Sequence, residues 1–398
     1  MGKALLLTAV LLVPHGTACA ASQSAAAPKS LAVGVAQTSL EATLEANCAQ
    51  IIQMTRQARQ RGCRVVVFPE AALYSPPSTP RAAIDQAVTQ IQEAARTENL
   101  YVLFGLRYKE RDRDAPHERL LLLGPDGRVL HTYDKLWADA RFPNAPGLFH
   151  IDGIPCAATL CADRWLRAVE ELPVFAGARI LFECSANFAN EWIPNLEWYW
   201  YVPRALRNGV YVVFANTAHH NPGTATPGHG HSAVVAPDGA VITAAGAEAR
   251  RLLVARLDLT RATAAEAARR ATHPLFRAFW QTGVRILQGE SVAEEAFEPL
   301  TAPPTRVTLA AAQMACSRNP AHNLSTMERL ISEAKARGAD AVAFPETCVT
   351  GAIEADIRAA AIPMLQEALD RLRQAARRAG IVVVFGMPWR EGQRRFNA

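Results

Sequence analysis

Three residues able to take part in covalent chemistry follow apolar, strand-like runs in this sequence. Cys161, Glu70 and Lys135 each come at or just past the end of such a run. A thiol can attack a weakly electrophilic carbon, a carboxylate can move its proton, and an ammonium can stabilise negative charge that develops. The carboxyl ends of neighbouring strands are the usual place of α/β active sites, so we expect the three side chains at one sheet edge.

Each of these residues also has a simpler interpretation. A cysteine beside an apolar strand is most often a buried structural residue, and a lysine just past a strand is most often a surface residue. For a glutamate at a strand end, a solvated residue is an equally good interpretation. A carboxylate directly after Val65–Phe68 is nevertheless expensive unless it lies on a sheet rim or is paired. The eight cysteines form no Cys-x-x-Cys pair, so neither a zinc site nor a disulfide scaffold is indicated, and no metal or cofactor is expected. They are Cys19, Cys48, Cys63, Cys156, Cys161, Cys184, Cys316 and Cys348.

The surroundings of Cys161 strengthen its candidacy. It ends the apolar strand predicted over Pro155–Cys161, and Asp163 is predicted to be the N-cap of a short helix over Arg164–Glu171. Backbone N–H groups at a helix N-terminus beside a thiol can lower its pKa and form an oxyanion hole.

The elements that must position these residues include an internal repeat. Residues 31–76 and 307–351 align without a gap at an offset of 276, with Phe68-Pro69-Glu70 matching Phe344-Pro345-Glu346. Each copy is typical of one βαβ unit. In the first, strands over Leu31–Val35 and Val65–Phe68 flank a helix over Leu44–Arg61.

Beyond the first repeat, helical and strand patterns continue to alternate. A helix is predicted over Ile84–Thr97 and a second, rich in Trp and Tyr, over Asn195–Asn208. The remaining predicted strands include a hairpin around Pro125-Asp126-Gly127. This mixture predicts an α/β protein with two packed sheets covered by helices. The predicted strands are Tyr101–Leu106, Leu120–Leu123, Val129–Tyr133, Ile180–Glu183, Tyr211–Asn216, Ser232–Val235, Val241–Thr243 and Leu252–Leu257.

Three segments together resemble a known family. Val66–Glu70, Tyr133-Asp134-Lys135 and Leu160–Asp163 are similar to the signature segments of the nitrilase (carbon–nitrogen hydrolase) superfamily, in the same order. The resemblance covers about residues 31–258 and the opening third of a second copy over 307–398. It implies a four-layer αββα sandwich of the nitrilase type, plus a partial second copy.

The resemblance also implies roles. Glu70 is expected to be the general base, Cys161 the nucleophile that forms a thioester or thioimidate, and Lys135 with the backbone N–H of Ala162 the stabiliser of the tetrahedral intermediate. Many relatives have a second glutamate in the loop after the lysine. The loop Leu136–Gly147 contains none, and Asp139 is its only carboxylate. The tryptophans and tyrosines at 192 and 198–201 are expected either to line the pocket or to pack on the sheet.

The repeat sets the expected domain organisation. Residues 1–28 are interpreted as a signal peptide and short linker, 29–258 as the hydrolase domain, 259–305 as a linker or C-terminal extension, and 306–398 as a partial second domain. The second copy matches Glu70 with Glu346 but offers no equivalent of Lys135 or Cys161. The interpretations are a truncated fragment of a second domain or a C-terminal piece that packs on the first domain, and truncation is favoured.

The N-terminus predicts export. A positive start at Lys3, the apolar run Ala4–Val13 and the small residues Thr17–Ala20 are typical of a secretory signal peptide, and a buried helix is the alternative. Lipidation at Cys19 is a minor alternative, because Gly16 stands where leucine is usual. No other stretch is apolar enough for a membrane span. Lys and Arg exceed Asp and Glu by 42 − 37 = 5 without clustering, which argues against a nucleic-acid surface.

The sequence therefore favours an exported hydrolase of small-molecule amides, carbamoyl compounds or nitriles. One alternative is an inactive nitrilase-fold binding or assembly module, which the missing loop glutamate motivates. Another is acyl transfer, as in lipoprotein N-acyltransferases, but these resemble multi-span membrane enzymes. The acyl group is left open, and so is a homo-oligomer, since relatives often dimerise.

Overall fold

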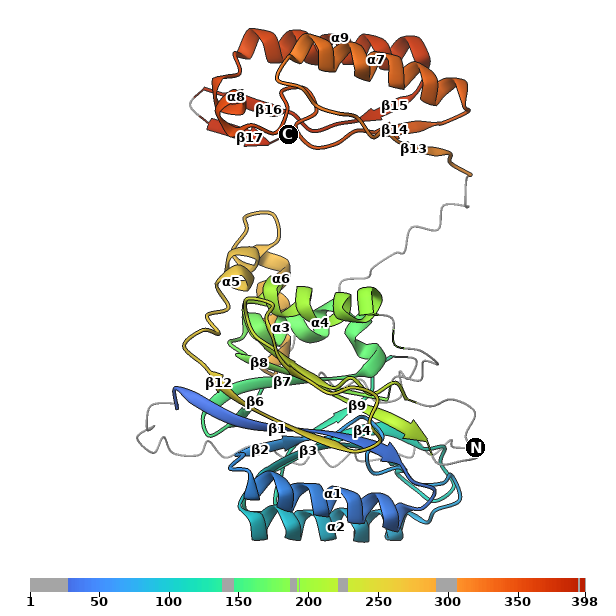
Figure 1. The fold of residues 1–398 in the computed structure, drawn as a ribbon, viewed down its shortest axis with the longest axis vertical. Coiled ribbons are helices and arrows are strands. Elements are labelled where there is room, and N and C mark those ends of the chain that lie inside the picture. Colours follow the sequence, from blue (N-terminus) through green and yellow to red (C-terminus); the bar gives the residue numbers. More distant parts are fainter. Residues whose placement is uncertain are drawn as a thin grey trace, which may run out of the picture. The chain divides into compact units, whose positions relative to one another are not determined.

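The computed structural model describes residues 28–137, 147–186, 192, 194–220, 228–290, 306–392 and 394–397. The chain divides into two compact units, Met1–Glu294 (unit 1) and Glu295–Ala398 (unit 2) (Figure 1). The expected signal segment, Cys19 and Asp139 lie outside the described residues, so export and lipidation stay predictions. None of the helices described here is long and apolar enough to cross a membrane.

Unit 1 contains a first sheet with the strand order β5-β4-β3-β2-β1-β12. Strands β1, β2 and β3 are parallel, whereas β4, β5 and β12 join them in antiparallel pairs. Its strands are β1 (Ser30–Leu40), β2 (Val65–Val67), β3 (Tyr101–Tyr108), β4 (His117–Leu123), β5 (Val129–Asp134) and β12 (Arg251–Asp258).

A second sheet has the order β6-β7-β8-β9-β10-β11 and a parallel centre, β7-β8-β9. Its strands are β6 (Phe149–Ile151), β7 (Ile154–Leu160), β8 (Ile180–Ser185), β9 (Tyr211–His220), β10 (Ala233–Val235) and β11 (Val241–Ala244). The two sheets join where the end of β1 pairs with β9, with Thr38 opposite Thr217. One strand, β1, is therefore hydrogen-bonded into both sheets.

Unit 1 is a four-layer αββα sandwich. The apolar cluster between the sheets includes Val35, Leu103 and Leu122 from the first sheet and Phe182 and Val213 from the second. The alternate strand residues face the helices, as the period of two in a strand requires. Helices α1 (Leu44–Gln60) and α2 (Arg81–Glu98) cover the first sheet, and α3 (Arg167–Phe175) and α4 (Pro194–Asn208) cover the second (Figure 1). The expected fold class is confirmed.

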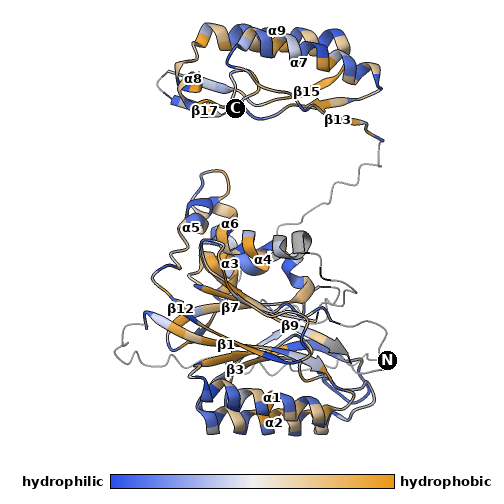
Figure 2. Cartoon of the chain, in the orientation of Figure 1, coloured by the Kyte–Doolittle hydropathy of each residue, from blue (hydrophilic) through white to orange (hydrophobic). Residues whose placement is uncertain are grey.

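The sequence explains this layering. The inner strands β2, β7 and β8 are largely apolar because both of their faces are covered, whereas outer strands such as β5 and β12 also carry exposed residues. Helices α1 and α2 alternate apolar and polar residues around the helix (Figure 2). α1 begins at the N-cap Thr43, whose hydroxyl accepts a hydrogen bond from the Ala46 N–H, and ends before Gly62 with φ +74°.

Residues 259–290 complete unit 1 on the side of α3 and α4. Helices α5 (Ala265–Ala271) and α6 (Arg277–Leu287) follow β12, and Ala267 of α5 lies in the apolar cluster that α3 and α4 form with the second sheet. Trp280 of α6 meets Phe175 of α3 edge to face, with ring centroids 4.8 Å apart. The segment expected as a linker or extension thus contributes two helices to the outer layer.

Unit 2 repeats the opening of unit 1. A parallel sheet β13-β14-β15 carries α7 and α9 on one face, where Met327, Ile331 and Leu372 are buried. Its elements are β13 (Leu309–Ala311), α7 (Pro320–Ala336), β14 (Ala341–Ala343), α8 (Glu354–Ala359), α9 (Ile362–Ala379), β15 (Val382–Val384), β16 (Pro388–Glu391) and β17 (Arg394–Asn397). The other sheet face is open, with Leu309 74 % and Val382 62 % exposed.

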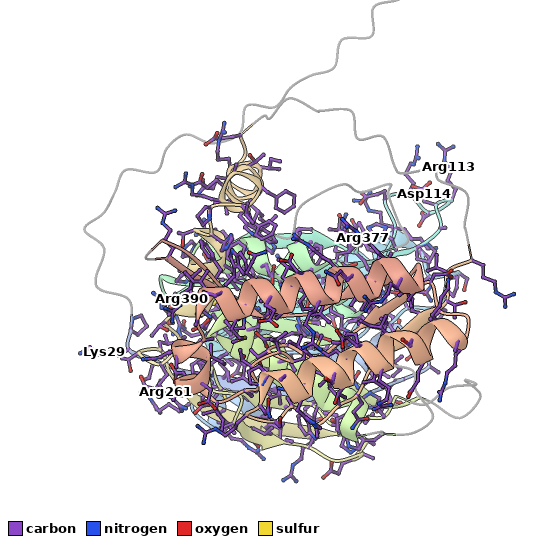
Figure 3. All side chains as sticks on the ribbon, turned by 90° about the horizontal axis from the view of Figure 1, so that it is seen from above. Lys29, Arg113, Asp114, Arg261, Arg377 and Arg390 are labelled. Atoms are coloured by element: carbon purple, nitrogen blue, oxygen red, sulfur yellow. The ribbon has the colours of Figure 1, made fainter. Side chains whose placement is uncertain are left out.

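Charged side chains cover the surfaces of both units. Figure 3 shows them, among them Arg113 and Asp114 between β3 and β4, Arg261 after β12, and Arg377 on α9. Both signs are present on these surfaces, which fits the small net charge of the chain.

Candidate active site

Glu70 follows β2 in a turn that packs closely on β3. The carbonyl oxygen of Pro69 accepts a hydrogen bond from the N–H of Gly105, at 3.1 Å. A Cβ atom at position 105 would lie 1.7 Å from the carbonyl oxygen of Glu70, so only glycine permits this approach. The side chain of Glu70 is buried beside the small apolar cluster of Leu40, Ala71 and Ala186. A carboxylate in such surroundings requires charged or hydrogen-bonding partners.

Two groups from other elements hold the Glu70 carboxylate. Lys135 Nζ, just past β5, donates to Oε1 at 2.6 Å, and the backbone N–H of Ala186, just past β8, donates to Oε2 at 3.1 Å. Burial alone would lower the pKa of Lys135, but the negative charges of Glu70 and of the Cys161 thiolate form outweigh it and raise that pKa. Lys135 therefore keeps its positive charge at neutral pH.

Cys161 begins the 3₁₀ helix η1 (Cys161–Trp165) directly after β7. Its φ is +45°, in the left-handed region that side-chain-bearing residues seldom adopt and that is found at functional sites. Burial, and then the Glu70 carboxylate, raise the pKa of the Cys161 thiol to about 12, although Lys135 opposes the rise. The thiol is therefore neutral at physiological pH, and it needs a base to become a nucleophile.

Asp163 ties the Cys161 turn to the Lys135 segment. Its buried carboxylate accepts hydrogen bonds from the Tyr133 hydroxyl and from the backbone N–H groups of Leu136, at 3.1 Å, and Trp137, at 2.6 Å. The predicted N-cap role of Asp163 is wrong: α3 begins at Arg167, and its N-cap position, Leu166, makes no side-chain cap hydrogen bond. The Asp163 carboxylate bonds the chain segment after β5 instead of capping the helix that follows it in the sequence.

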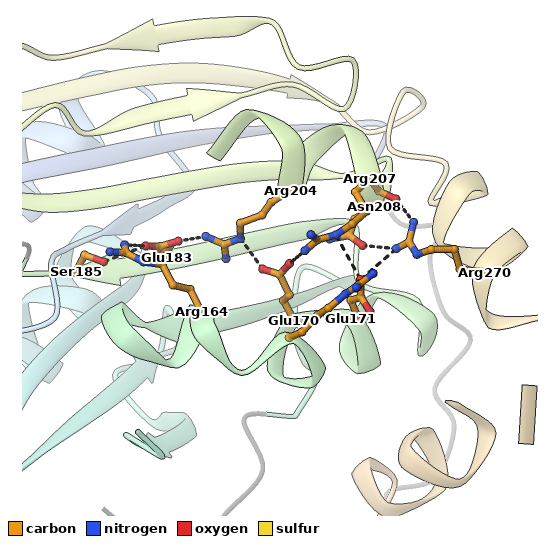
Figure 4. Close-up of polar contacts among 10 residues, drawn as sticks. Arg164, Glu170, Glu171, Glu183, Ser185, Arg204, Arg207, Asn208 and Arg270 are labelled. Carbon is orange, nitrogen blue, oxygen red and sulfur yellow. Dashed lines mark hydrogen bonds and ion pairs between the residues drawn. The ribbon is translucent and has the colours of Figure 1, made fainter. Parts of the chain in front are cut away.

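A buried chain of ion pairs runs behind this turn (Figure 4). Arg164 of η1 donates to Glu183 of β8 at 2.7 Å, and Arg204 of α4 bonds both Glu183 and Glu170 of α3. Burial opposes ionisation of Glu183, yet Arg204 and Arg164 hold its pKa below the ordinary value. Because Arg164 lies three residues after Cys161 and Glu183 three before Ala186, this network fixes both strand ends that meet Glu70.

An aromatic group lies on the side of α4. Trp192 stacks on His231, with ring centroids 4.1 Å apart, and meets Trp198 edge to face at 5.4 Å. Trp192 and Trp198 pack partly buried against the core between α4 and the second sheet, and Tyr201 is wholly inside it. For these residues the interpretation as sheet packing is confirmed. Burial lowers the pKa of the neighbouring His229 to about 4.

The structure thus brings Glu70 and Lys135 into contact and places Cys161 within electrostatic reach of both. Ala162 lies in the first turn of η1, where backbone N–H groups lack an acceptor within the helix. Sequence reasoning missed Glu183, His229 and the tertiary role of Asp163. For these residues, the one signal in the sequence was the charged side chain of Glu183 inside the strand Ile180–Ser185. No group of three or more metal-binding side chains is found in the described part of the chain.

Comparison with known proteins agrees with this architecture. The sequence profile described as carbon–nitrogen hydrolase matches residues 32–267 and 308–398. An amidase from Nesterenkonia sp. superposes with a TM-score of 0.54 at 18 % identity, covering 65 % of this chain and 100 % of the amidase. A cysteine-to-alanine variant of the Nesterenkonia AN1 amidase, described as of the nitrilase superfamily, gives 0.54 and 18 % over 64 % and 100 % of the two chains.

A third similar structure carries a bound group. It is a glutamate-to-glutamine variant of the amidase from Nesterenkonia sp. AN1, in which the acetamide moiety of fluoroacetamide is added covalently at the active-site cysteine. It matches with a TM-score of 0.54 at 19 % identity, over 64 % of this chain and 100 % of that one. At this identity the likeness shows the shared fold.

Proposed function

Because this chain belongs to the carbon–nitrogen hydrolase family, which the profile match over most of its length shows, we propose that unit 1 hydrolyses a non-peptide carbon–nitrogen bond of a small molecule. Cys161 is the nucleophile, Glu70 the general base, and Lys135 the cation that stabilises the intermediate. The observation that carries this proposal is the 2.6 Å pair of Lys135 and Glu70 at the strand end beside Cys161, with its left-handed backbone.

The first half of the reaction acylates the enzyme. Cys161 is a neutral thiol in its resting state, so its attack on the amide carbon needs simultaneous transfer of the thiol proton to Glu70. The new S–C bond turns the carbonyl oxygen into an oxyanion. Lys135 and the N–H of Ala162 stabilise that oxygen. Glu70 then gives its proton to the leaving nitrogen, the C–N bond breaks, and a thioester remains.

The second half releases the acid. Glu70, again a carboxylate, takes a proton from water as the water attacks the thioester carbon. The tetrahedral intermediate collapses with loss of the Cys161 sulfur, which regains the proton from Glu70. The balance is one amide and one water giving one acid and one ammonia or amine. With a nitrile, the first adduct is a thioimidate, and two waters are consumed.

The substrate class follows from this chemistry rather than from the shape of the pocket. An unactivated amide, carbamoyl group or nitrile has a poorly electrophilic carbon and benefits from a sulfur nucleophile with a paired base and cation. The covalent acetamide adduct at the active-site cysteine of the similar amidase supports an amide among these candidates. No step requires a metal or an organic cofactor.

The test replaces Cys161 and uses another cysteine as a control. Cys161 and Cys316 are the cysteines, among those described, that are not fully buried. Cys161→Ala should lower kcat/KM for an accepted amide by at least about 10⁴-fold, because the covalent route is lost. Cys316→Ala should leave kcat/KM unchanged. The assay measures ammonia release from a panel of small amides, carbamoyl compounds and nitriles.

Mass spectrometry of the intact protein gives a second readout. Rapid quenching during turnover should show an acyl adduct on Cys161, and hydroxylamine should remove it. Full turnover by Cys161→Ala would overturn the proposal. Absence of both turnover and adduct across the panel, with Cys161 still alkylated by iodoacetamide, would instead support the inactive binding module.

A further inference from the structure

A second carboxyl, that of Glu118, lies in the same part of unit 1. Glu118 is near the start of β4, where β3 and β5 flank it on either side. Arg107 of β3 is the direct cross-strand partner of Glu118. On the other side, the carbonyl oxygen of Glu118 accepts a hydrogen bond from the backbone N–H of Lys135 at 2.9 Å. Directly opposed residues of antiparallel strands project to the same sheet face. Arg107, Glu118 and Lys135 therefore form one row across three neighbouring chain segments.

This row projects between the two sheets. In β4 the side chains of Leu120 and Leu122 belong to the core between the sheets, and Glu118 shares their alternation. Tyr133, two residues before Lys135, lies in the same core. Arg119, between Glu118 and Leu120, projects to the opposite face, where it pairs with Asp134 at 2.6 Å. Glu118 thus faces the layer that holds Lys135 and Glu70.

The carboxyl of Glu118 is only partly neutralised. Its Oε1 lies 3.4 Å from Nε of Arg107, and the side chain is 25 % exposed. Its Oε2 is buried without a hydrogen-bond partner among the described residues. A buried carboxylate oxygen without a partner is costly, so this position favours the protonated form of the group.

We propose that Glu118 is a positioning residue of this site, a second carboxyl that orients Lys135 across the strand pair and alters the charge around it as the pH rises. The inference rests on the proposed function. The charged groups that face Glu118 in the described part of the chain are Arg107 from β3, Lys135 from the end of β5, and Glu70 from the segment after β2.

The electrostatics agree with this geometry. Burial, and then the negative charge of Glu70, raise the pKa of Glu118 to about 8, while Arg107 and Lys135 oppose the rise. Below that pH the Glu118 carboxyl is neutral, and the positive charge of Lys135 interacts with Glu70 and with the oxyanion of the intermediate. Above it a second anion flanks Lys135 and disfavours the negative transition state. Hydrolysis should therefore decline as the pH rises through about 8.

The experiment compares pH profiles of the full-length protein. For the wild type, we expect kcat/KM to decline with a midpoint near pH 8. Glu118→Gln keeps the shape of the neutral acid and should lose this decline, which would make its rate at about pH 9, relative to its own rate at about pH 7, about tenfold higher than the wild type's. Arg107→Gln removes the cation that lowers the pKa of Glu118, so it should move the decline to higher pH.

Glu110→Gln is the matched control. Glu110 pairs with Arg119, which projects from the other face of β4, at 2.6 Å. This variant also removes one carboxyl from an arginine pair and should keep the wild-type profile. A merely structural Glu118 would lower the rate of Glu118→Gln at every pH without moving the decline. Identical profiles of wild type, Glu118→Gln and Arg107→Gln would overturn the inference.

A readout without turnover separates this inference from the proposed function. The rate of Cys161 alkylation by iodoacetamide should rise less steeply above about pH 8 in the wild type than in Glu118→Gln, because an ionised Glu118 offsets part of the positive charge of Lys135 that stabilises the thiolate. Lack of hydrolysis with this difference intact would refute only the proposed function. Hydrolysis without any difference between the two profiles would refute only the role of Glu118.

Discussion

Units 1 and 2 begin with the same βαβ design and use it differently. In both, a buried asparagine on the first helix, Asn47 or Asn323, hydrogen-bonds the chain just before that helix. In both, a glycine in or just past the third strand lies against the Phe-Pro-Glu turn, Gly105 at Glu70 and Gly386 at Glu346. Yet Glu70 is buried and Glu346 is exposed.

The difference lies in what covers the sheet. Val33, Val67 and Leu103 face the second sheet of unit 1 and are fully buried. Their counterparts in unit 2, Leu309, Ala343 and Val384, are exposed. Glu70 meets Ala186 at the end of β8 and Lys135 past β5, and unit 2 has no described counterpart of either. The repeated motif thus places a glutamate in both units, but only in unit 1 do the described elements around it bury the carboxylate and give it a lysine partner.

The largest expected effect tests whether this difference decides activity. Glu70→Gln removes the proposed base and should lower kcat/KM for an accepted amide by about 10³-fold, since general-base catalysis contributes about 10² to 10⁴. Glu346→Gln, at the matching exposed position, should change kcat/KM by less than about twofold. Equal losses in the two variants would show that burial and the pair with Lys135 do not set Glu70 apart from Glu346.

The next effect concerns ion pairs. Arg204→Met removes one arginine from each of two buried carboxylates, leaving Glu183 with Arg164 and Glu170 with Arg207, and should lower the free energy of unfolding of unit 1 by about 3–5 kcal/mol. Arg371→Met breaks the half-exposed Arg371–Glu328 pair of unit 2 and should cost at most about 1 kcal/mol there. Hydrogen-exchange mass spectrometry assigns each loss to its unit. A similar loss of unfolding free energy in both units would contradict a special stabilising role of the buried ion pairs that connect η1, β8, α3 and α4.

Matched core truncations sharpen the comparison of sheet faces. Leu103→Ala should lower the free energy of unfolding of unit 1 by about 2–5 kcal/mol, because the side chain is fully buried between the sheets. Val384→Ala, 58 % exposed on the corresponding face of unit 2, should change that unit by about 0.5 kcal/mol or less. Denaturant titration followed by hydrogen exchange measures both. A large loss for Val384→Ala would show that its face is covered in solution.

The smallest predicted effect depends on pH. Burial lowers the pKa of His229 in unit 1 to about 4 from an ordinary 6.5, so the unfolded chain binds the proton more tightly. The stability contribution is fully present above about pH 6.5 and falls as the pH decreases toward 4. Unit 1 should lose about 2 kcal/mol between about pH 7 and about pH 5. The histidine of unit 2, His322, is exposed.

Urea unfolding at the two pH values measures this loss, with His229→Gln as the comparison. The variant lacks the titrating group, so it should lose clearly less stability between the two pH values than the wild type. An unchanged slope in His229→Gln would assign the acid sensitivity to other groups.

Local patterns in the sequence were sufficient to predict much of the fold. The repeat, the strand–helix alternation and the hairpin at Pro125–Gly127 depend on neighbours in the chain, and α1, predicted over Leu44–Arg61, is observed over Leu44–Gln60. The meeting of Glu70 with Lys135 was also expected, from the rule that active sites lie at the carboxyl ends of strands.

What the sequence could not indicate depends on long-range register. Asp163 has a spacing typical of a helix cap, but in the fold its carboxylate bonds the Tyr133 hydroxyl and the backbone of the segment around Lys135. Glu118 becomes a neighbour of Lys135 only through the pairing of β4 with β5, and Glu183 looks out of place in a strand until Arg164 and Arg204 meet it. Pairings of this kind leave no local pattern.

The position of β1 in both sheets has a consequence for biogenesis. β1 ends at Leu40, yet its antiparallel partner β12 spans Arg251–Asp258, and Ser30 pairs with Asp258. During synthesis more than two hundred further residues must be made before β1 can form its hydrogen bonds with β12. Contacts of such sequence separation slow folding and expose an unpaired edge in the interim. The nascent chain of unit 1 should thus depend on chaperones until β12 has left the ribosome.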